Sequence, residues 1–130
     1  MSSEPKETLR SVRSAVEEEL SIFLNREGAY LNSISPDLSP VSESLTSFLL
    51  DSGKRLRPLF AYAGFAAAGG HLDKAAIRAM AALELLQACA LIHDDLMDGS
   101  DTRRGKPSIH RHFESVHVRE QLDGVAPQYG

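Results

Sequence analysis

Residues 72–97 read LDKAAIRAMAALELLQACALIHDDLM, and this stretch decides the fold because it contains neither proline nor glycine. Its apolar residues recur at spacings of three and four, which favours a helix over a strand. Gly99 follows where a C-terminal cap is expected. At a rise of 1.5 Å per residue, the predicted helix is about 40 Å long. Because apolar residues occupy most of its circumference, we expect it to be buried on most sides, with Cys89 and His93 in the core.

Two more helices are predicted near the start of the chain. Residues 8–27 carry an apolar stripe at helical spacing, and Gly28 is expected to end that helix. Ser39 and Pro40 form a typical N-cap and first-turn pair, which predicts a second, short helix.

A third upstream helix is predicted from Pro58 to the Gly69–Gly70 pair. The sequence after Asp98 has the composition of a loop, and its periodicity becomes weak from Ser115 onward. No stretch alternates cleanly with period two, so we expect no sheet. The predicted fold class is therefore all-α, in one domain over residues 1–130.

The composition excludes several classes of protein. The chain has 130 residues, with 14 Lys plus Arg against 18 Asp plus Glu, and a formal net charge of -4. It therefore lacks the basic field that holds nucleic acid, and no nucleic-acid partner is expected. No uncharged apolar run reaches about 18 residues, so no membrane span is predicted. The polar N-terminus and the single cysteine favour a cytoplasmic location.

The long helix carries a polar face that is mostly acidic. At 100° per residue, one arc of about 100° holds Glu84, Gln87, Leu91, Asp94, Asp95 and Asp98. Asp94 and Asp98 are one turn apart, about 5–6 Å between Cβ atoms, so both carboxylates can reach the same group of hard cations. Magnesium (Mg2+) suits this arrangement because it takes one or two carboxylates and completes its coordination with water and phosphate oxygens. The competing interpretation is that the three aspartates are simply solvated at a helix end.

Two basic clusters flank this acidic helix in the sequence. Downstream, ten residues without an acid contain Arg103, Arg104, Lys106, His110, Arg111 and His112. Upstream, Lys54, Arg55 and Arg57 precede a predicted helix N-terminus, where free backbone N–H groups favour an anion. Either cluster alone is more typical of a solvated charge run. Together with the acidic face, they indicate two phosphate-bearing ligands.

Four motifs in this order resemble the trans-isoprenyl diphosphate synthases, also called polyprenyl synthetases. They are GKRLRP at residues 53–58, ELLQ at 84–87, LIHDDLMD at 91–98 and RRGKP at 103–107. The resemblance, in particular to bacterial geranylgeranyl diphosphate synthases, covers the chain from the first helix to Phe113 and corresponds to the N-terminal portion of a family member. It implies an all-α, isoprenoid synthase-type helical bundle, a homodimer in the full-length form, and magnesium as cofactor.

The resemblance also implies roles for the acidic face. Asp94 and Asp98 would hold magnesium ions against the diphosphate of an allylic prenyl diphosphate, and Asp95 would support the site. Arg103 would contact the same diphosphate.

A second set of residues is implied for isopentenyl diphosphate. Lys54, Arg57 and Arg104 would hold it, and Gln87 stands where the family often has a histidine that serves the same substrate. The implied enzyme is a prenyltransferase that condenses isopentenyl diphosphate with an allylic prenyl diphosphate by magnesium-assisted ionisation. Its expected product is geranylgeranyl diphosphate or a similar chain.

Besides Gln87, two further departures from the family pattern matter. Ser52 stands where the family often has the first glycine of a Gly-Gly pair, and the second aspartate-rich motif of the family does not occur before Gly130. We therefore expect the chain to be the N-terminal portion of a larger protein and to lack activity alone. Two alternatives stay open: a non-catalytic regulatory subunit of a heteromeric prenyl diphosphate synthase, and a fragment of a class I terpene cyclase. The first would be expected to have lost these aspartates and arginines, and the second would not need an isopentenyl diphosphate site.

Overall fold

The computed structural model describes residues 5–51 and 53–130, so Ser52 lies outside the described residues. The chain divides into two compact units, one reaching to Leu86 and the other extending from Gln87 to Gly130. Almost all of the regular structure in these ranges is helical, which confirms the all-α fold class.

The first helix is longer than its sequence predicts. Helix α1 extends over Pro5–Ile34 and passes through Gly28, so the expectation that Gly28 ends the helix was wrong. A Cβ placed on Gly28 would lie 3.4 Å from the Cβ of Ser42 in the following helix. A glycine inside a helix costs about 1 kcal/mol relative to alanine. The distance is an ordinary van der Waals contact, so α1 tolerates a glycine here without the packing against α2 requiring one.

The chain is already helical before Ser39. A short 3-10 helix, η1 (Pro36–Leu38), leads directly into α2 (Ser39–Leu50), whose N-cap is Leu38. The predicted capping role of Ser39 was therefore wrong. Ser35 caps η1 instead, its hydroxyl accepting a hydrogen bond from the backbone N–H of Asp37 at 3.2 Å.

Helix α3 (Leu56–Ala67) begins two residues earlier than predicted, and its N-cap is Arg55. Its C-terminus agrees with the sequence. Gly69 has a φ of 80°, and the N–H groups of Gly70 and Gly69 donate to the carbonyls of Phe65 and Ala66 at 2.9 and 3.0 Å. This pair of bonds is a Schellman motif, which requires a residue that tolerates positive φ.

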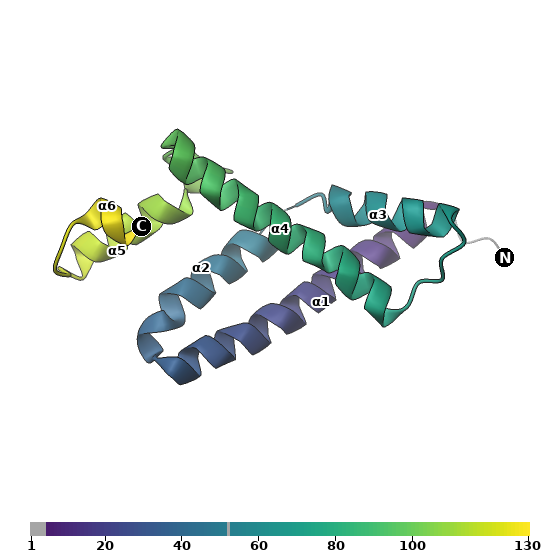
Figure 1. Cartoon of the computed structure of the whole chain (residues 1–130), viewed down its shortest axis with the longest axis horizontal. Helices are drawn as coiled ribbons and strands as arrows, with labels where there is room; N and C mark the ends of the chain where they lie inside the picture. Colours follow the sequence, from purple (N-terminus) through teal and green to yellow (C-terminus); the bar gives the residue numbers. More distant parts are fainter. Residues whose placement is uncertain (1–4, 52) are drawn as a thin grey trace. The chain divides into compact units, whose positions relative to one another are not determined.

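The core of the first unit lies between α1 and the first half of α4 (Lys74–Asp98). Its buried residues are Val12, Val16, Leu20, Ile77, Met80 and Ala81. Helix α2 runs back alongside α1, and α3 also contacts α1 (Figure 1). The burial of these apolar side chains is the main favourable contribution to the stability of this unit.

Helix α4 agrees with its predicted bounds within two residues, and Gly99, with a φ of 63°, ends it as expected. The expectation that α4 is buried on most sides was wrong for the described part of the chain. Leu86 is 67% exposed and Met97 is 82% exposed, and Cys89 and His93 are exposed rather than in the core. The covered residues follow one stripe at helical spacing, because a helix packed on one side buries one stripe only.

Helix α4 is also, among the residues in 5–51 and 53–130, the one helix long and apolar enough to cross a membrane. The mean hydropathy of its most apolar window is 1.6. Length and composition alone are weak grounds, since core helices of water-soluble proteins have the same properties. The absence of a membrane span therefore stays a prediction.

The second unit contains a hairpin that the sequence reading missed. Strands β1 (Thr102–Arg103) and β2 (Lys106–Pro107) pair antiparallel, so the expectations of a loop here and of no sheet were wrong. Arg104 and Gly105 have φ values of 54° and 78°. Positive φ at both central residues is the mark of the type I′ turn, whose twist matches a two-residue hairpin.

Two helices complete this unit, although the periodicity from Ser115 onward appeared weak. Helix α5 covers Ile109–Arg119 and the short α6 covers Ala126–Tyr129. They pack together through aromatic contacts, with the ring centroids of His117 and Tyr129 5.5 Å apart.

Candidate functional site

The three aspartates at the end of α4 occupy two different environments. Asp95 is buried at 2% exposure, whereas Asp94 and Asp98 are exposed. The helical period explains the division, because Asp95 continues the buried stripe of α4 and the other two fall on its outer edge. The single acidic face expected from the sequence is therefore split into a buried and an accessible part.

Asp95 and Arg103 form a bidentate ion pair. The Nε of Arg103 donates to Oδ2 of Asp95 at 2.6 Å, and Nη2 donates to Oδ1 at 2.7 Å. Such fork-to-fork pairs fix geometry as well as charge. The side chain of Arg103 keeps 29% of its surface exposed while that of Asp95 keeps 3%. Asp95 thus fixes the guanidinium in place and leaves part of it accessible.

The charge states of the pair follow from this geometry. The hydrogen bond from Arg103 holds the pKa of Asp95 below its ordinary value, outweighing burial, which acts in the opposite direction. The charge of Arg103 and the electrostatic influence of His110 lower that pKa further. In turn, the hydrogen bond to Asp95 raises the pKa of Arg103, with a smaller contribution from the charge of Asp94. Both groups are therefore ionised at neutral pH.

The hairpin that carries Arg103 is anchored at its base by Ser108. This serine is 1% exposed, and its hydroxyl donates to the carbonyl of Ser100 at 2.7 Å. Its backbone N–H donates to the carbonyl of Asp101 at 3.0 Å. A Schellman motif at Gly99 joins α4 to the hairpin, because the N–H of Ser100 donates to the carbonyl of Asp95 itself at 2.9 Å. The backbone of Asp95 and the strand bearing Arg103 are thereby linked by a short, well-bonded corner.

The downstream basic cluster is not uniformly available to an anion. Arg111 donates to Oε2 of Glu114 at 2.7 Å and to Oδ1 of Asp101 at 2.8 Å, and these hydrogen bonds raise its pKa. His110 is buried, with its Nδ1 lacking a hydrogen-bond partner in the described part of the chain. Arg104, in the hairpin turn, is exposed.

The upstream cluster is divided in the same way. Lys54 and Arg57 are exposed at the start of α3, where the first N–H groups of the helix have no intrahelical partners. Arg55 is 4% exposed and its Nη1 donates to Oε2 of Glu84 at 2.9 Å. Gln87 is half-buried on α4, in the second unit.

The sequence reading did not foresee the pair formed by Arg55 and Glu84. One signal was present, since Glu84 is the only acid between Lys74 and His93 in an otherwise apolar helix. A carboxylate in such a position is either at the surface or paired. The identity of its partner is not encoded locally, because Arg55 lies 29 residues earlier in the chain.

Comparison with known proteins places this arrangement in a family. Residues 39–118 match the sequence profile of the polyprenyl synthetases. The chain belongs to the polyprenyl synthetase family. All of the predicted site residues, from Lys54 to Arg104, fall within the matched region.

Individual polyprenyl synthetases agree with this assignment. Geranylgeranyl pyrophosphate synthase 11, chloroplastic, of Arabidopsis thaliana is 43% identical over 75 residues, which are 56% of this chain and 21% of the relative. Heptaprenyl diphosphate synthase component 2 of Geobacillus stearothermophilus is 36% identical over 97 residues, which are 74% of this chain and 27% of the relative. The chain thus spans about a quarter of the length of these relatives.

A solved structure shares the fold. The crystal structure of geranylgeranyl pyrophosphate synthase from Corynebacterium glutamicum, complexed with isoprenyl diphosphate and magnesium, has a TM-score of 0.83 and 40% sequence identity. The match covers 93% of this chain and 35% of that one. This likeness extends the family assignment to the three-dimensional fold.

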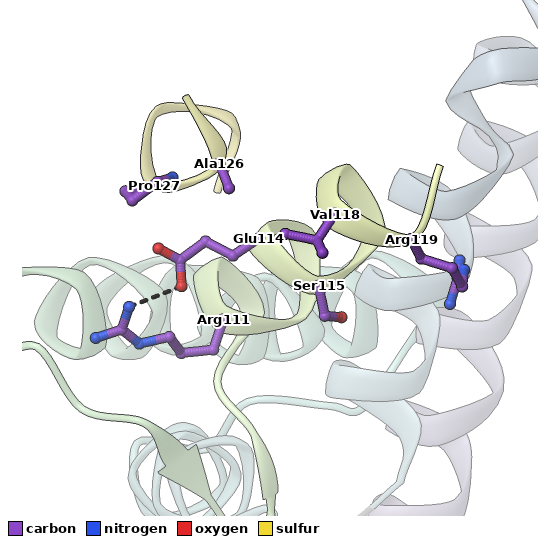
Figure 2. Close-up of a pocket in the computed structure, with 7 residues that line it drawn as sticks. All are labelled: Arg111, Glu114, Ser115, Val118, Arg119, Ala126 and Pro127. Carbon is purple, nitrogen blue, oxygen red and sulfur yellow. Dashed lines mark hydrogen bonds and ion pairs between the residues drawn. The ribbon is translucent and has the colours of Figure 1, made fainter. Parts of the chain in front are cut away.

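This polyprenyl synthetase chain also has a surface pocket away from the aspartates. It lies between α5 and α6, and its lining includes Val118, Ala126 and Pro127, with the ion pair of Arg111 and Glu114 along one side (Figure 2). Arg111 belongs to the downstream basic cluster, but none of the residues to which the family resemblance gives a role lines the pocket.

Proposed function

We propose that the protein acts in prenyl transfer, condensing isopentenyl diphosphate with an allylic prenyl diphosphate. The observation that carries the proposal is the end of α4, where exposed Asp94 and Asp98 stand one turn apart beside an arginine that buried Asp95 holds in place. The family assignment and the relatives named as geranylgeranyl pyrophosphate synthases support the same chemistry. Geranylgeranyl diphosphate is the product we propose, and a homodimer is the form we propose for the full-length protein.

The residues present fit magnesium. Asp94 and Asp98 are exposed carboxylates on adjacent turns of one helix. No group of three or more metal-ligating side chains occurs among residues 5–51 and 53–130. Two carboxylates suit magnesium, which keeps several waters and is commonly completed by substrate phosphates rather than by a full protein cage. When bound, the ion supplies positive charge that stabilises the pyrophosphate leaving group.

Arg103 supplies a further positive charge for the same leaving group. A guanidinium has five N–H donors, and the two bonds to Asp95 leave others for a diphosphate oxygen. Because Asp95 already fixes its position, Arg103 need not reorganise when negative charge develops on the leaving group. We assign Asp95 as a positioning residue for Arg103, not as a metal ligand, because its own carboxylate is buried.

The second substrate needs its own anion site. We assign Lys54 and Arg57, at the start of α3, to the diphosphate of isopentenyl diphosphate. The role of Gln87 and Arg104 toward the same substrate stays a prediction from the family resemblance. In the proposed reaction, the allylic C–O bond breaks and both electrons leave with pyrophosphate. The alkene of isopentenyl diphosphate then forms the new C–C bond with the allylic cation. A proton lost from the adduct to pyrophosphate restores a double bond, which balances the reaction.

Calorimetry tests the metal-binding part of the proposal. Geranyl diphosphate should bind the chain with magnesium present and bind at least tenfold more weakly in excess chelator, because two carboxylates repel an uncompensated diphosphate. Asp94→Asn and Asp98→Asn should each weaken the magnesium-dependent binding. The control is Asp123→Asn, an exposed acid of the second unit, which should bind as the parent does. Equal affinity with and without chelator would contradict the proposal.

The two alternatives predict different results in the same experiment. A regulatory subunit would bind geranyl diphosphate no better with magnesium than without it. A terpene cyclase would keep the magnesium dependence but would not bind isopentenyl diphosphate. Titration with isopentenyl diphosphate, followed by Lys54→Gln and Arg57→Gln, separates this last alternative from a condensing enzyme.

A further inference from the structure

Arg55 differs from the two cations on either side of it. Lys54 and Arg57 are exposed, but the side chain of Arg55 keeps only 3% of its surface accessible. A basic residue is almost never buried to this extent unless it is paired. Arg55 is therefore not accessible to a ligand as its neighbours are. Its contribution comes from the contacts that it makes inside the protein.

Those contacts tie Arg55 to three helices of the first unit. Nη1 donates to Oε2 of Glu84 on α4 at 2.9 Å, and Nη2 donates to the backbone carbonyl of Leu49 in α2 at 2.7 Å. Nε lies 3.6 Å from Oε1 of Glu17 on α1. The carboxylate of Glu84 is itself 11% exposed, so this pair is largely shielded from water. Shielded charge-assisted bonds of this kind fix a position more firmly than surface pairs do.

The backbone around Arg55 is constrained as well. Arg55 has a φ of 50°, a left-handed conformation that residues other than glycine seldom adopt. A Cβ placed on Gly53 would lie 3.0 Å from Nη1 of Arg55, so the absence of a side chain there gives the guanidinium room. The carbonyl of Gly53 accepts a hydrogen bond from Nη2 of Arg13 on α1 at 2.8 Å. Residues 53–55 are thus held by the hydrogen bond to the backbone of Gly53 and by the bonds that the side chain of Arg55 makes.

We propose that Arg55 is a positioning residue for a diphosphate-binding segment. By anchoring residues 53–57 to α1, α2 and α4, it holds Lys54 and Arg57 on either side of itself at the N-terminal end of α3. One anionic group can then meet both cations and the free N–H groups of the helix together. This inference rests on the proposed function only in assigning Lys54 and Arg57 to a diphosphate. The motif GKRLRP therefore contains two kinds of cation: one that anchors and two that bind.

A double-mutant cycle with inorganic pyrophosphate tests the inference. Affinity is measured by calorimetry in the 130-residue chain with chelator present, so that a magnesium-loaded aspartate site does not contribute. Arg55→Lys keeps the charge but lacks the two Nη groups that bond Glu84 and Leu49. It should weaken pyrophosphate binding about tenfold, as the loss of residues that orient a binding group commonly does. Lys54→Gln should weaken binding strongly in the parent and much less in Arg55→Lys, because a misplaced Lys54 has less to contribute.

The controls separate positioning from general stability. Arg78→Lys alters another arginine that pairs with a glutamate across α1 and α4, with 62% of its side chain exposed, and it should bind pyrophosphate as the parent does. Glu84→Gln keeps Arg55 and weakens its anchor, which provides the same test if Arg55→Lys does not fold. Circular dichroism at the calorimetry temperature verifies that each variant is folded.

Each outcome has a defined meaning. If Lys54→Gln weakens binding by the same factor in the parent and in Arg55→Lys, or if Arg55→Lys and Glu84→Gln both bind as the parent does, the positioning role is overturned while the diphosphate site stands. If Lys54→Gln and Arg57→Gln bind pyrophosphate as well as the parent, the diphosphate site is wrong, and the positioning role falls with it. Non-additive losses of the predicted direction support the inference.

Discussion

The two units of the chain each contain an arginine paired with a carboxylate of α4, and the pairs differ in what they leave exposed. In the first unit, Arg55 and Glu84 keep 3% and 11% of their side-chain surfaces accessible. In the second, Asp95 keeps 3% of its side-chain surface accessible and Arg103 keeps 29%. The same pair of chemical groups can therefore act as an internal anchor or as a prepared binding group. Which role it takes depends on whether the cation retains access to solvent.

The largest effect is expected from a substitution that removes the ion pair of Arg55 and Glu84. Glu84→Ala leaves the guanidinium of Arg55 buried without its carboxylate, which should cost about 3–5 kcal/mol in the free energy of unfolding. Urea denaturation followed by circular dichroism measures this quantity. A loss below about 1 kcal/mol would show that water reaches Arg55 and that the two pairs do not differ as proposed.

A smaller effect is expected at the second pair. Asp95→Asn removes the charge of a buried group that bonds Arg103 twice, and should cost about 1.5–3 kcal/mol, because the partly exposed guanidinium can turn to water. The same substitution should weaken magnesium-dependent binding of geranyl diphosphate by releasing Arg103. Unchanged diphosphate affinity in a folded Asp95→Asn variant would count against the positioning role of Asp95.

The pair also predicts a pH dependence with a definite sign. The pKa of Asp95 is below its ordinary value of 3.8 in the folded state. Its contribution to stability is therefore complete above about pH 3.8 and is lost as the pH falls through the lower, folded pKa. The stability difference between the parent and Asp95→Asn should shrink over that acidic range. A difference that stays constant there would contradict the assigned charge state.

The smallest expected effect concerns a surface pair that joins the same helices as the anchor. Arg78 bonds Oε2 of Glu19 at 3.3 Å with 62% of its side chain exposed. Arg78→Ala should change the free energy of unfolding by less than about 1 kcal/mol, measured in the same urea titration. A loss as large as that of Glu84→Ala would mean that burial is not what separates these pairs.

The sequence predicted the helical part of the site because the relevant information is local. The period of α4 places Asp94 and Asp98 on one face, and Gly99 marks the end of the helix. The burial of Asp95 was not predictable in this way, because it depends on the hairpin that brings Arg103 back to it. That hairpin was missed because its turn uses Arg104 and Gly105, which lack the usual Asn-Gly signature.

In the first unit, too, the sequence predicts the local structure but not the contacts between distant residues. The apolar stripe of α1 supplies the buried residues Val12, Val16 and Leu20, as its spacing predicts, but the helix continues through Gly28 to Ile34. A single glycine is only a weak helix breaker, and its local preference alone does not fix where a helix ends. The cations at residues 54–57 appeared equivalent in the sequence. Contacts with Leu49 and Glu84, distant along the chain, make Arg55 an internal group and leave its neighbours at the surface.

Because of the corner formed at Gly99 and Ser100, the position of Arg103 depends on the length of the connection between α4 and the hairpin. The N–H of Ser100 is bonded to the carbonyl of Asp95, and the hairpin begins at Thr102. The connection from the end of α4 to Arg103 is therefore short and fixed by hydrogen bonds. One inserted or deleted residue between Asp98 and Thr102 would disrupt this bonded corner and move the strand relative to Asp95, so that Arg103 could no longer bond its carboxylate as it does here. Changes in length at the entrance of the hairpin should therefore weaken the ion pair of Asp95 and Arg103.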